Sequence, residues 1–364
     1  MTAAPPAFAF ERSTSPMPAN ERAGLIADPG FGRIFTDHMA TVRYSSDRGW
    51  HDLKIGARRP IQTDLATSVL HYAQEIFEGM KAYGRPGGGA ALFRPDANAR
   101  RFRDSARRMA MPELPEEIFL ESIRALVRSE IDWIPPGEDG ALYLRPFMFA
   151  SEVFLGVKPA DEYLYAVIAS SVGGYFKGGS PAISLWATRE YSRAAPGGTG
   201  AAKCGGNYAA SLIAQAEAIR QGCDQVVFLD AIERRWIEEL GGMNIFFAFE
   251  DGSLQTPPLT GTILPGITRD SIIRLARDLG VTVREEPYSI EQWQADAQSG
   301  RLTETFACGT AAVVTAIGQV KTAEGGFAIG GQSVGPLTQR LKAALVDIQR
   351  GRAEDPYGWV ETVV

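Results

Sequence analysis

The sequence predicts an α+β protein with two domains, and three observations lead to that prediction. The length of 364 residues corresponds to roughly two domains of ordinary size. Strand candidates that suit antiparallel pairing come in runs and are followed by helices, whereas a doubly wound parallel sheet alternates the two. Four glycines lie among the seven residues 173–179 and interrupt the strand pattern, so we expect the domain boundary there.

The first half predicts a small N-terminal domain over 23–173, preceded by a proline-rich mobile arm over 1–22. A helical pattern begins near residue 66 and gives way to a glycine at position 79. Further strands are expected over 35–44, 90–93, 142–149 and 162–171. Amphipathic helices are expected over 96–109, with Asp96 as its N-cap, and over 115–131.

The second half predicts an interdomain loop over 174–182 and a larger domain over 183–364. Asp251-Gly252 is a strong hairpin signal between two strands. Strands are expected over 183–188, 226–229, 235–238, 244–249 and 303–308. Helices are expected over 207–221, 268–279, 289–298 and 335–349, with Thr268 as the N-cap of the second.

The composition excludes several classes of protein. Lys and Arg number 37 and Asp and Glu 43, and the resulting net charge of −6 does not suit non-specific binding to nucleic acid or to anionic membranes. The 3 cysteines form no C-x-x-C pair, and the 3 histidines show no i, i+4 spacing, so neither a disulfide framework nor a metal site is expected. No membrane-spanning run or signal-peptide pattern is evident, and we expect a cytoplasmic protein.

Four features of the second half carry possible chemistry. Lys203 lies among small residues, where partial burial would lower its pKa and make its amine nucleophilic, although a lone lysine is more often at the surface. Glu238-Glu239 precedes two glycines at a strand end, so one carboxylate could face a cleft. Thr268 begins a helix, and Thr310 lies in a turn of small residues; both places expose backbone N–H groups that suit an anion.

Together these features supply an amine nucleophile, a carboxylate and two anion-binding turns, which is the set of groups that pyridoxal 5′-phosphate requires. The amine would form a Schiff base, the carboxylate would keep the pyridine nitrogen protonated, and the turns would hold the phosphate. A nicotinamide cofactor is a weaker alternative, because no complete G-x-G-x-x-G lies between a strand and a helix. No P-loop is present in the sequence.

On these residues the chain resembles the branched-chain amino acid aminotransferases, which are fold type IV enzymes that use pyridoxal 5′-phosphate. The resemblance runs from about Phe31 to Trp359. Its strongest motifs are KCGGNY at 203–208, LPGITR at 264–269, FEGMKAY at 77–83, FGRIFTDHM at 31–39 and SARR at 105–108. It implies a smaller N-terminal α/β domain, a larger C-terminal pseudo-barrel domain and a homodimer.

The resemblance also implies residue roles. Lys203 would be the Schiff-base lysine, Glu239 rather than Glu238 would contact the pyridine nitrogen, and Tyr208 would hydrogen-bond the phenolic oxygen. The implied phosphate ligands are Arg101, Ile267, Thr268 and Thr310. Arg101 follows Asn98 by three residues as in the family pattern, but several neighbouring arginines compete for this role.

The implied substrate site is largely apolar. Its side-chain walls would be Phe31, Phe77, Tyr143 and Tyr175, with Tyr72 contributed by the partner subunit. Arg145 would help to accept a second carboxylate, and the backbone N–H groups of Thr310 and Ala311 would bind the α-carboxylate. Many family members have Thr where this chain has Gly242, so the pocket is expected to be roomier.

The predicted reaction is transamination between leucine, isoleucine or valine and 2-oxoglutarate, with pyridoxal 5′-phosphate as cofactor and no metal. Two alternatives of the same fold are a D-amino acid aminotransferase and an aminodeoxychorismate lyase, which are typically shorter chains without the segment over 31–39. A third alternative, of another class, is a non-catalytic protein that binds the cofactor.

Overall fold

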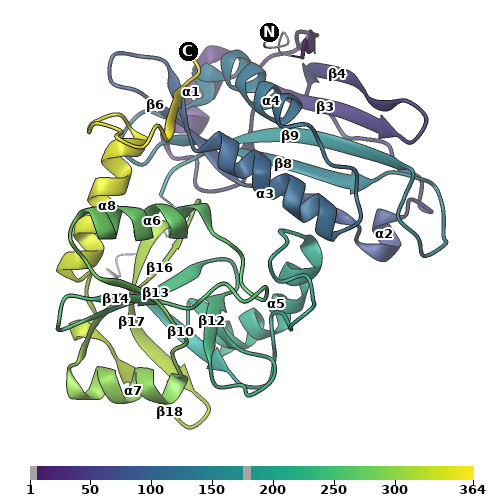
Figure 1. Ribbon diagram of the computed structural model, residues 1–364. Coiled ribbons are helices and arrows are strands. Elements are labelled where there is room, and N and C mark those ends of the chain that lie inside the picture. Colours follow the sequence, from purple (N-terminus) through teal and green to yellow (C-terminus); the bar gives the residue numbers. More distant parts are fainter. Residues whose placement is uncertain (1–5, 175–181) are drawn as a thin grey trace. The chain divides into compact units, whose positions relative to one another are not determined.

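The computed structural model describes residues 6–174 and 182–364, which divide into two compact units with one β-sheet each (Figure 1). The first unit combines the described residues up to 174 with the short segment Ala202–Gly205 and the C-terminal Ile348–Val364. The second unit holds 182–201 and 206–347. Of the loop expected over 174–182, only residues 174 and 182 are described. The predicted site residue Tyr175 lies outside the described residues.

The described part of the first unit contains a ten-stranded sheet. Its strands are β1 (Ala9–Phe10), β2 (Ile34–Phe35), β3 (His38–Ser45), β4 (Gly49–Ala57), β5 (Glu75–Phe77), β6 (Met80–Gly84), β7 (Ala90–Phe93), β8 (Ala141–Ala150), β9 (Glu162–Val172) and β19 (Val360–Thr362). They follow the order β1-β4-β3-β9-β8-β6-β7-β19, with β2 on β9 and β5 on β8. All of these pairings are antiparallel except that of β1 with β4.

The two long helices α3 and α4 cover one face of this sheet (Figure 1). The helices of the unit are α1 (Ala19–Ala27), α2 (Val69–Tyr72), α3 (Pro95–Arg108) and α4 (Glu116–Ser129). Between ring centroids, Phe102 of α3 lies 5.4 Å from Phe119 of α4 and 5.6 Å from Tyr165 of β9. All three rings are buried, so α3 is fixed to α4 and to the sheet through its apolar face.

Two expectations for this unit were wrong in detail. Within the arm expected over 1–22, Ala9–Phe10 pairs with β4 and α1 begins at Ala19. The helix expected from residue 66 is only the four-residue α2, which ends where Ala73 adopts a left-handed conformation with φ 50°. Asp96 is not an N-cap: Pro95 occupies the first turn of α3, and Asp96 pairs with Arg100 one turn later.

The described part of the second unit contains a nine-stranded sheet. Its strands are β10 (Ile183–Thr188), β11 (Gln225–Leu229), β12 (Ile237–Leu240), β13 (Asn244–Phe249), β14 (Leu254–Thr256), β15 (Val283–Glu285), β16 (Leu302–Gly309), β17 (Val313–Thr322) and β18 (Gly325–Ala328). They follow the order β12-β11-β10-β17-β16-β13-β14-β15, with β18 on β17. Three pairings, β10–β11, β10–β17 and β14–β15, are parallel and the others are antiparallel.

The second-unit helices are α5 (Gly205–Arg220), α6 (Ile267–Asp278), α7 (Ile290–Ser299) and α8 (Pro336–Gln349). Ser289 caps α7 in a capping box with Gln292, at the start that the sequence predicts. Thr268 was wrongly expected as an N-cap: Gly266 holds that position, so Thr268 is the second residue of α6. Two sheets with helices at their faces confirm the α+β class. Among the described residues, no helix is both long and apolar enough to cross a membrane.

Candidate active site

Lys203 belongs to the first unit, where its backbone is held on two sides. The backbone N–H of Phe77 donates to the Lys203 carbonyl at 2.9 Å, and the Lys203 N–H donates to Oγ of Ser105 on α3 at 3.0 Å. The half-buried side chain places Nζ 4.7 Å from the centroid of the Phe77 ring. A Cβ on Gly205 would lie 1.9 Å from Oε1 of Glu75, so a larger residue here would have to displace the Glu75 carboxylate.

Arg101 points to the inner side of α3 and pairs with Glu78. Its Nε lies 2.7 Å from Oε1 of Glu78 and its Nη2 lies 2.8 Å from Oε2. Asn98, one turn earlier, donates to Oε2 at 2.7 Å. Burial by itself raises the pKa of the Glu78 carboxyl, but the charge and hydrogen bonds of Arg101, with contributions from Lys203 and Asn98, hold the pKa below its usual value. Glu78 is therefore a buried carboxylate.

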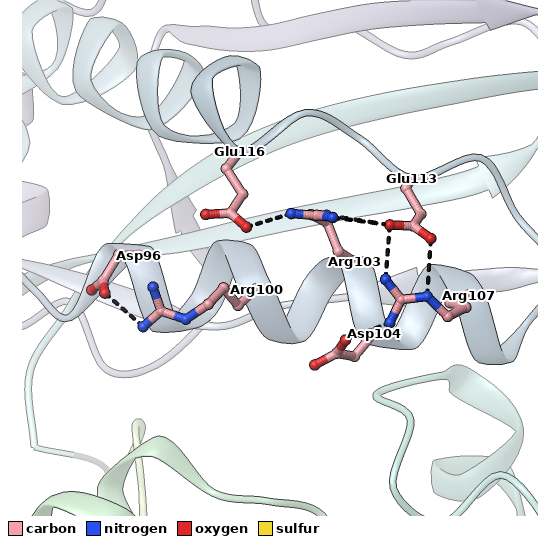
Figure 2. Close-up of polar contacts among 7 residues, drawn as sticks. All are labelled: Asp96, Arg100, Arg103, Asp104, Arg107, Glu113 and Glu116. Atoms are coloured by element: carbon pink, nitrogen blue, oxygen red, sulfur yellow. Dashed lines mark hydrogen bonds and ion pairs between the residues drawn. The ribbon is translucent and has the colours of Figure 1, made fainter.

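Three other arginines of α3 lie on its outer side (Figure 2). They pair with acids near them: Arg100 with Asp96, Arg103 with Glu113 and Glu116, and Arg107 with Asp104 and Glu113. Arg94, just before α3, lies over the Trp359 ring at 5.1 Å. Of the arginines that compete in the sequence, Arg101 is the buried one, at 8% exposure.

Four of the residues predicted for the substrate site form one cluster in the first unit. The ring of Phe31 lies 5.1 Å from that of Tyr143, whose hydroxyl accepts a 3.0 Å hydrogen bond from Nη2 of Arg145. The Arg145 guanidinium lies 4.7 Å from the Phe77 centroid. A Cβ on Gly79 would lie 2.2 Å from the Tyr143 hydroxyl, so the cluster closes around a glycine.

Glu75 is an acid near this cluster that the sequence patterns do not single out. Its carboxylate accepts a hydrogen bond from the Gly205 N–H and feels the charge of Arg145. Burial outweighs both and raises the pKa of the Glu75 carboxyl. Tyr72 lies on α2 with 37% exposure, and its hydroxyl donates to the Leu155 carbonyl.

In the second unit, Glu239 is held by Arg193, a residue that no sequence motif indicates. Oε1 of Glu239 lies 2.9 Å from Nη1 of Arg193 and accepts the Leu264 N–H at 2.8 Å. Nη1 also donates to the carbonyls of Gly200 and Thr262, at 3.4 and 3.1 Å. Both charged side chains are 2% exposed. A buried guanidinium at this distance favours the charged form of a carboxylate.

The two adjacent acids of β12 point in different directions, as successive strand residues do. Glu238 accepts a hydrogen bond from the Thr262 hydroxyl, and its Oε2 is buried without a hydrogen-bond partner in the described structure. Burial raises the pKa of the Glu238 carboxyl. The Arg193 charge also lowers the pKa of Glu238, but burial outweighs it, whereas Glu239 forms the close ion pair with that guanidinium.

The start of α6 lies close to Glu239 through one amide side chain. Nδ2 of Asn244 donates to the Leu264 carbonyl at 3.1 Å and lies 3.5 Å from Oε2 of Glu239. A Cβ on Gly266 would lie 2.0 Å from Oδ1 of the same asparagine, so a larger residue here would have to displace the Asn244 amide. Ile267 and Thr268 form the first turn of α6, where backbone N–H groups favour an anion.

The remaining predicted residues of this unit lie at two further places. Thr310 and Ala311 form the tight turn between β16 and β17. Tyr208 lies in the first turn of α5, and a Cβ on Gly242 would be 3.7 Å from its ring, an ordinary contact distance. A larger residue than Gly242 would therefore fit, and its absence leaves space beside Tyr208.

Each unit, taken by itself, carries groups that fit pyridoxal 5′-phosphate. The first holds a lysine beside a buried, oriented guanidinium that suits a phosphate. The second holds a buried carboxylate stabilised by an arginine, which suits a pyridine nitrogen, and a helix N-terminus that suits an anion.

Comparisons with known proteins agree with this chemistry. A family model described as amino-transferase class IV matches residues 75–320. A probable branched-chain-amino-acid aminotransferase of Streptomyces coelicolor is 54% identical over 359 residues, which cover 98% of this chain and 99% of the relative. The branched-chain-amino-acid aminotransferase of Mycolicibacterium smegmatis is 52% identical over 364 residues, covering 99% of both chains.

Solved structures give the same result. The branched-chain amino acid aminotransferase of Escherichia coli superposes with a TM-score of 0.73 at 31% identity, covering 90% of this chain and 99% of that one. The branched-chain amino acid aminotransferase of T.th., in complex with N-(5′-phosphopyridoxyl)-L-glutamate, gives a TM-score of 0.71 at 27% identity, covering 89% of this chain and 99% of that one.

Proposed function

This chain belongs to the branched-chain amino acid aminotransferases of class IV, and on that premise we propose how its residues divide the work of the reaction. The enzyme exchanges amino groups between branched-chain L-amino acids and 2-oxo acids, with pyridoxal 5′-phosphate as cofactor. Identity of 54% over 98% of the chain carries this conclusion. We further propose that leucine, isoleucine and valine are the amino donors and that 2-oxoglutarate is the acceptor.

Lys203 is proposed as the catalytic residue. Bound pyridoxal 5′-phosphate supplies an electron sink for the negative charge that develops at Cα of the amino acid. With the cofactor bound, the Lys203 amine would anchor it and would move the proton at Cα of the amino acid. The Lys203 backbone is hydrogen-bonded to Phe77 and Ser105. This supports the role because a proton-transfer group must keep its position.

The cofactor-binding roles follow from charge and burial. Glu239, kept ionised by Arg193, would hold the pyridine nitrogen protonated, and Tyr208 would hydrogen-bond the phenolic oxygen. The proposed phosphate ligands are the Arg101 guanidinium, the α6 N-terminus at Ile267 and Thr268, and Thr310.

The substrate residues must accept both an aliphatic chain and a second carboxylate. The Phe31, Phe77 and Tyr143 rings provide an apolar wall, and Arg145 at its edge provides a cation that is hydrogen-bonded to Tyr143. Nε of Arg145 is buried and has no hydrogen-bond partner among the described residues, which suits an anionic ligand. Thr310 and Ala311 would bind the α-carboxylate through backbone N–H groups, and Tyr175 would complete the wall.

A homodimer is proposed from an exposed apolar surface on the first unit. Five aliphatic side chains around α2 and the segment before β9 are 58–88% exposed: Leu65, Leu70, Val153, Leu155 and Val157. The Phe154 N–H donates to the Ala66 carbonyl, so the two segments are adjacent. An apolar patch of this kind favours burial against a second copy, and Tyr72 beside it would reach the partner's site.

The three free cysteines support the predicted cytoplasmic location.

The test is amino-group transfer from leucine, isoleucine, valine and aromatic amino acids to 2-oxoglutarate, measured for the wild type and for Lys203→Ala. The wild type is expected to use the branched-chain donors. Lys203→Ala is expected to lose at least about 1,000-fold in turnover, together with the absorbance of the covalently held cofactor. Lys342→Ala, which alters an exposed lysine of α8, should change neither. Turnover of Lys203→Ala at the wild-type rate would contradict the assignment.

A further inference from the structure

We propose that Glu78 is a positioning residue: it orients the Arg101 guanidinium toward a phosphate group and couples that orientation to the Lys203 segment. The inference rests on the proposed role of Arg101 as a phosphate ligand. Glu78 does not itself contact substrate or cofactor in this proposal. It acts through the arginine that it holds.

The geometry of the pair defines one edge of the guanidinium. Glu78 accepts from Nε and Nη2 of Arg101 at 2.7 and 2.8 Å, through a different oxygen at each position. Because a guanidinium is planar and carries five N–H donors, the edge formed by Nη1 and Nη2 then faces away from Glu78. A bidentate contact fixes both the position and the plane of the group, which a single contact would not do.

The carboxylate is itself held in place. Asn98 donates to Oε2 at 2.7 Å and the Gly79 N–H donates to the same oxygen at 3.2 Å. Glu78 has no exposed surface, so water does not compete for these contacts. Asn98 and Arg101 are three residues apart on the inner side of α3, and both side chains therefore reach the same acid.

The same contacts link Glu78 to Lys203. The residue before Glu78, Phe77, donates its backbone N–H to the Lys203 carbonyl. Ser105, one helical turn after Arg101, accepts the Lys203 N–H. Two cations, Arg101 and Lys203, act electrostatically on this one buried carboxylate. Removing its charge would leave both without their shared anion and would release the orientation of Arg101.

The experiment compares reconstitution of the full-length enzyme with pyridoxal 5′-phosphate and with pyridoxal, which lacks the phosphate. The quantity measured is the dissociation constant of pyridoxal divided by that of pyridoxal 5′-phosphate, which exceeds one when the enzyme binds the phosphate group. In Glu78→Gln this ratio should fall about 10- to 100-fold toward unity, because a misoriented guanidinium loses charge-assisted hydrogen bonds to the phosphate. In an Arg101→Ala background, Glu78→Gln should cause no further fall.

Glu130→Gln is the matched control. Glu130 follows α4 in the same unit, has 1% side-chain exposure and pairs with His38, so its substitution alters an equally buried acid at a different place in the unit. Its ratio should equal that of the wild type. If Glu78→Gln does not fold, Glu78→Asp keeps the charge but shortens the side chain by one methylene, and its ratio should also fall.

The outcomes separate two failures. An unchanged ratio in Arg101→Ala would show that Arg101 does not bind the phosphate, and the proposed function would lose that ligand. A fall in Arg101→Ala without a fall in folded Glu78→Gln or Glu78→Asp would overturn the positioning role alone. A fall of the same size in Glu130→Gln would also overturn it, because the effect would then follow from any lost buried carboxylate.

Discussion

In each unit, the described residues include a buried pair of arginine and glutamate, and these two pairs are built differently. Glu78 holds Arg101 through both carboxylate oxygens, on Nε and Nη2. Oε1 of Glu239 lies 2.9 Å from Nη1 of Arg193 and also accepts a backbone N–H. In the first pair we assign the contact with the cofactor to the arginine, and in the second to the acid. On these assignments, pairs of the same composition would present opposite members to the cofactor.

The largest expected effect tests this reversal of roles. Glu239→Gln should retain most of its affinity for the cofactor but lose about 100-fold or more in kcat, because a neutral amide cannot keep the pyridine nitrogen protonated. Steady-state kinetics and cofactor titration of both proteins measure the split. Glu78→Gln should show the opposite pattern, with the larger change in affinity. Equal losses of kcat in the two variants would contradict the comparison.

The next effect concerns the stability that Arg193 contributes as the ion-pair partner of Glu239. Arg193→Met should lower the free energy of unfolding by about 3–5 kcal/mol, because it leaves the Glu239 carboxylate buried without its cation. Urea denaturation measures the change. The double variant with Glu239→Gln should recover part of the loss, since the amide carries no charge. Arg107→Ala, on the exposed face of α3 (Figure 2), is the control and should change stability far less.

The smallest effect is the pH dependence of two buried acids that differ in the cation beside them. Arg101 holds the pKa of Glu78 below its usual value, so the stability that Glu78 contributes is present above about pH 4.5 and is lost as the pH falls. Burial raises the pKa of Glu238, so its ionisation costs stability as the pH rises from about 4.5. Between pH 7 and pH 3, the unfolding free energy of the wild type should therefore fall relative to that of Glu78→Gln. Over the same range it should rise relative to that of Glu238→Gln. Slopes of the same sign would refute this account.

Much of the fold follows from local sequence. The helices α4, α7 and α8 and the strands β8 and β9 lie within a few residues of their predicted bounds, because apolar periodicity, caps and glycines act over one or two turns. The class of fold, the cofactor and the reaction are confirmed by family membership. The caps at Asp96 and Thr268 were wrong because Pro95 and Gly266 begin those helices earlier than the cap residues suggested.

The contacts within the candidate site could not be predicted from the sequence, for a physical reason. Glu78 and Arg101 are 23 residues apart and Arg193 and Glu239 are 46 apart in the chain, and no local pattern links them. Burial separates Arg101 from its outward-facing neighbours on α3, and burial depends on α4 and the sheet as well as on the helix itself. The roles of Lys203, Tyr208 and the substrate residues stay predictions that the proposed variants test.

The absence of a side chain at Gly79 has a consequence for substrate selection. A single methyl group there would push the Tyr143 phenol aside and break its hydrogen bond to Arg145. The apolar wall and the cation at its edge would then move together, because one hydroxyl joins them. On the proposed roles of Tyr143 and Arg145, one methyl group at position 79 would disturb the aliphatic and the anionic part of the site together.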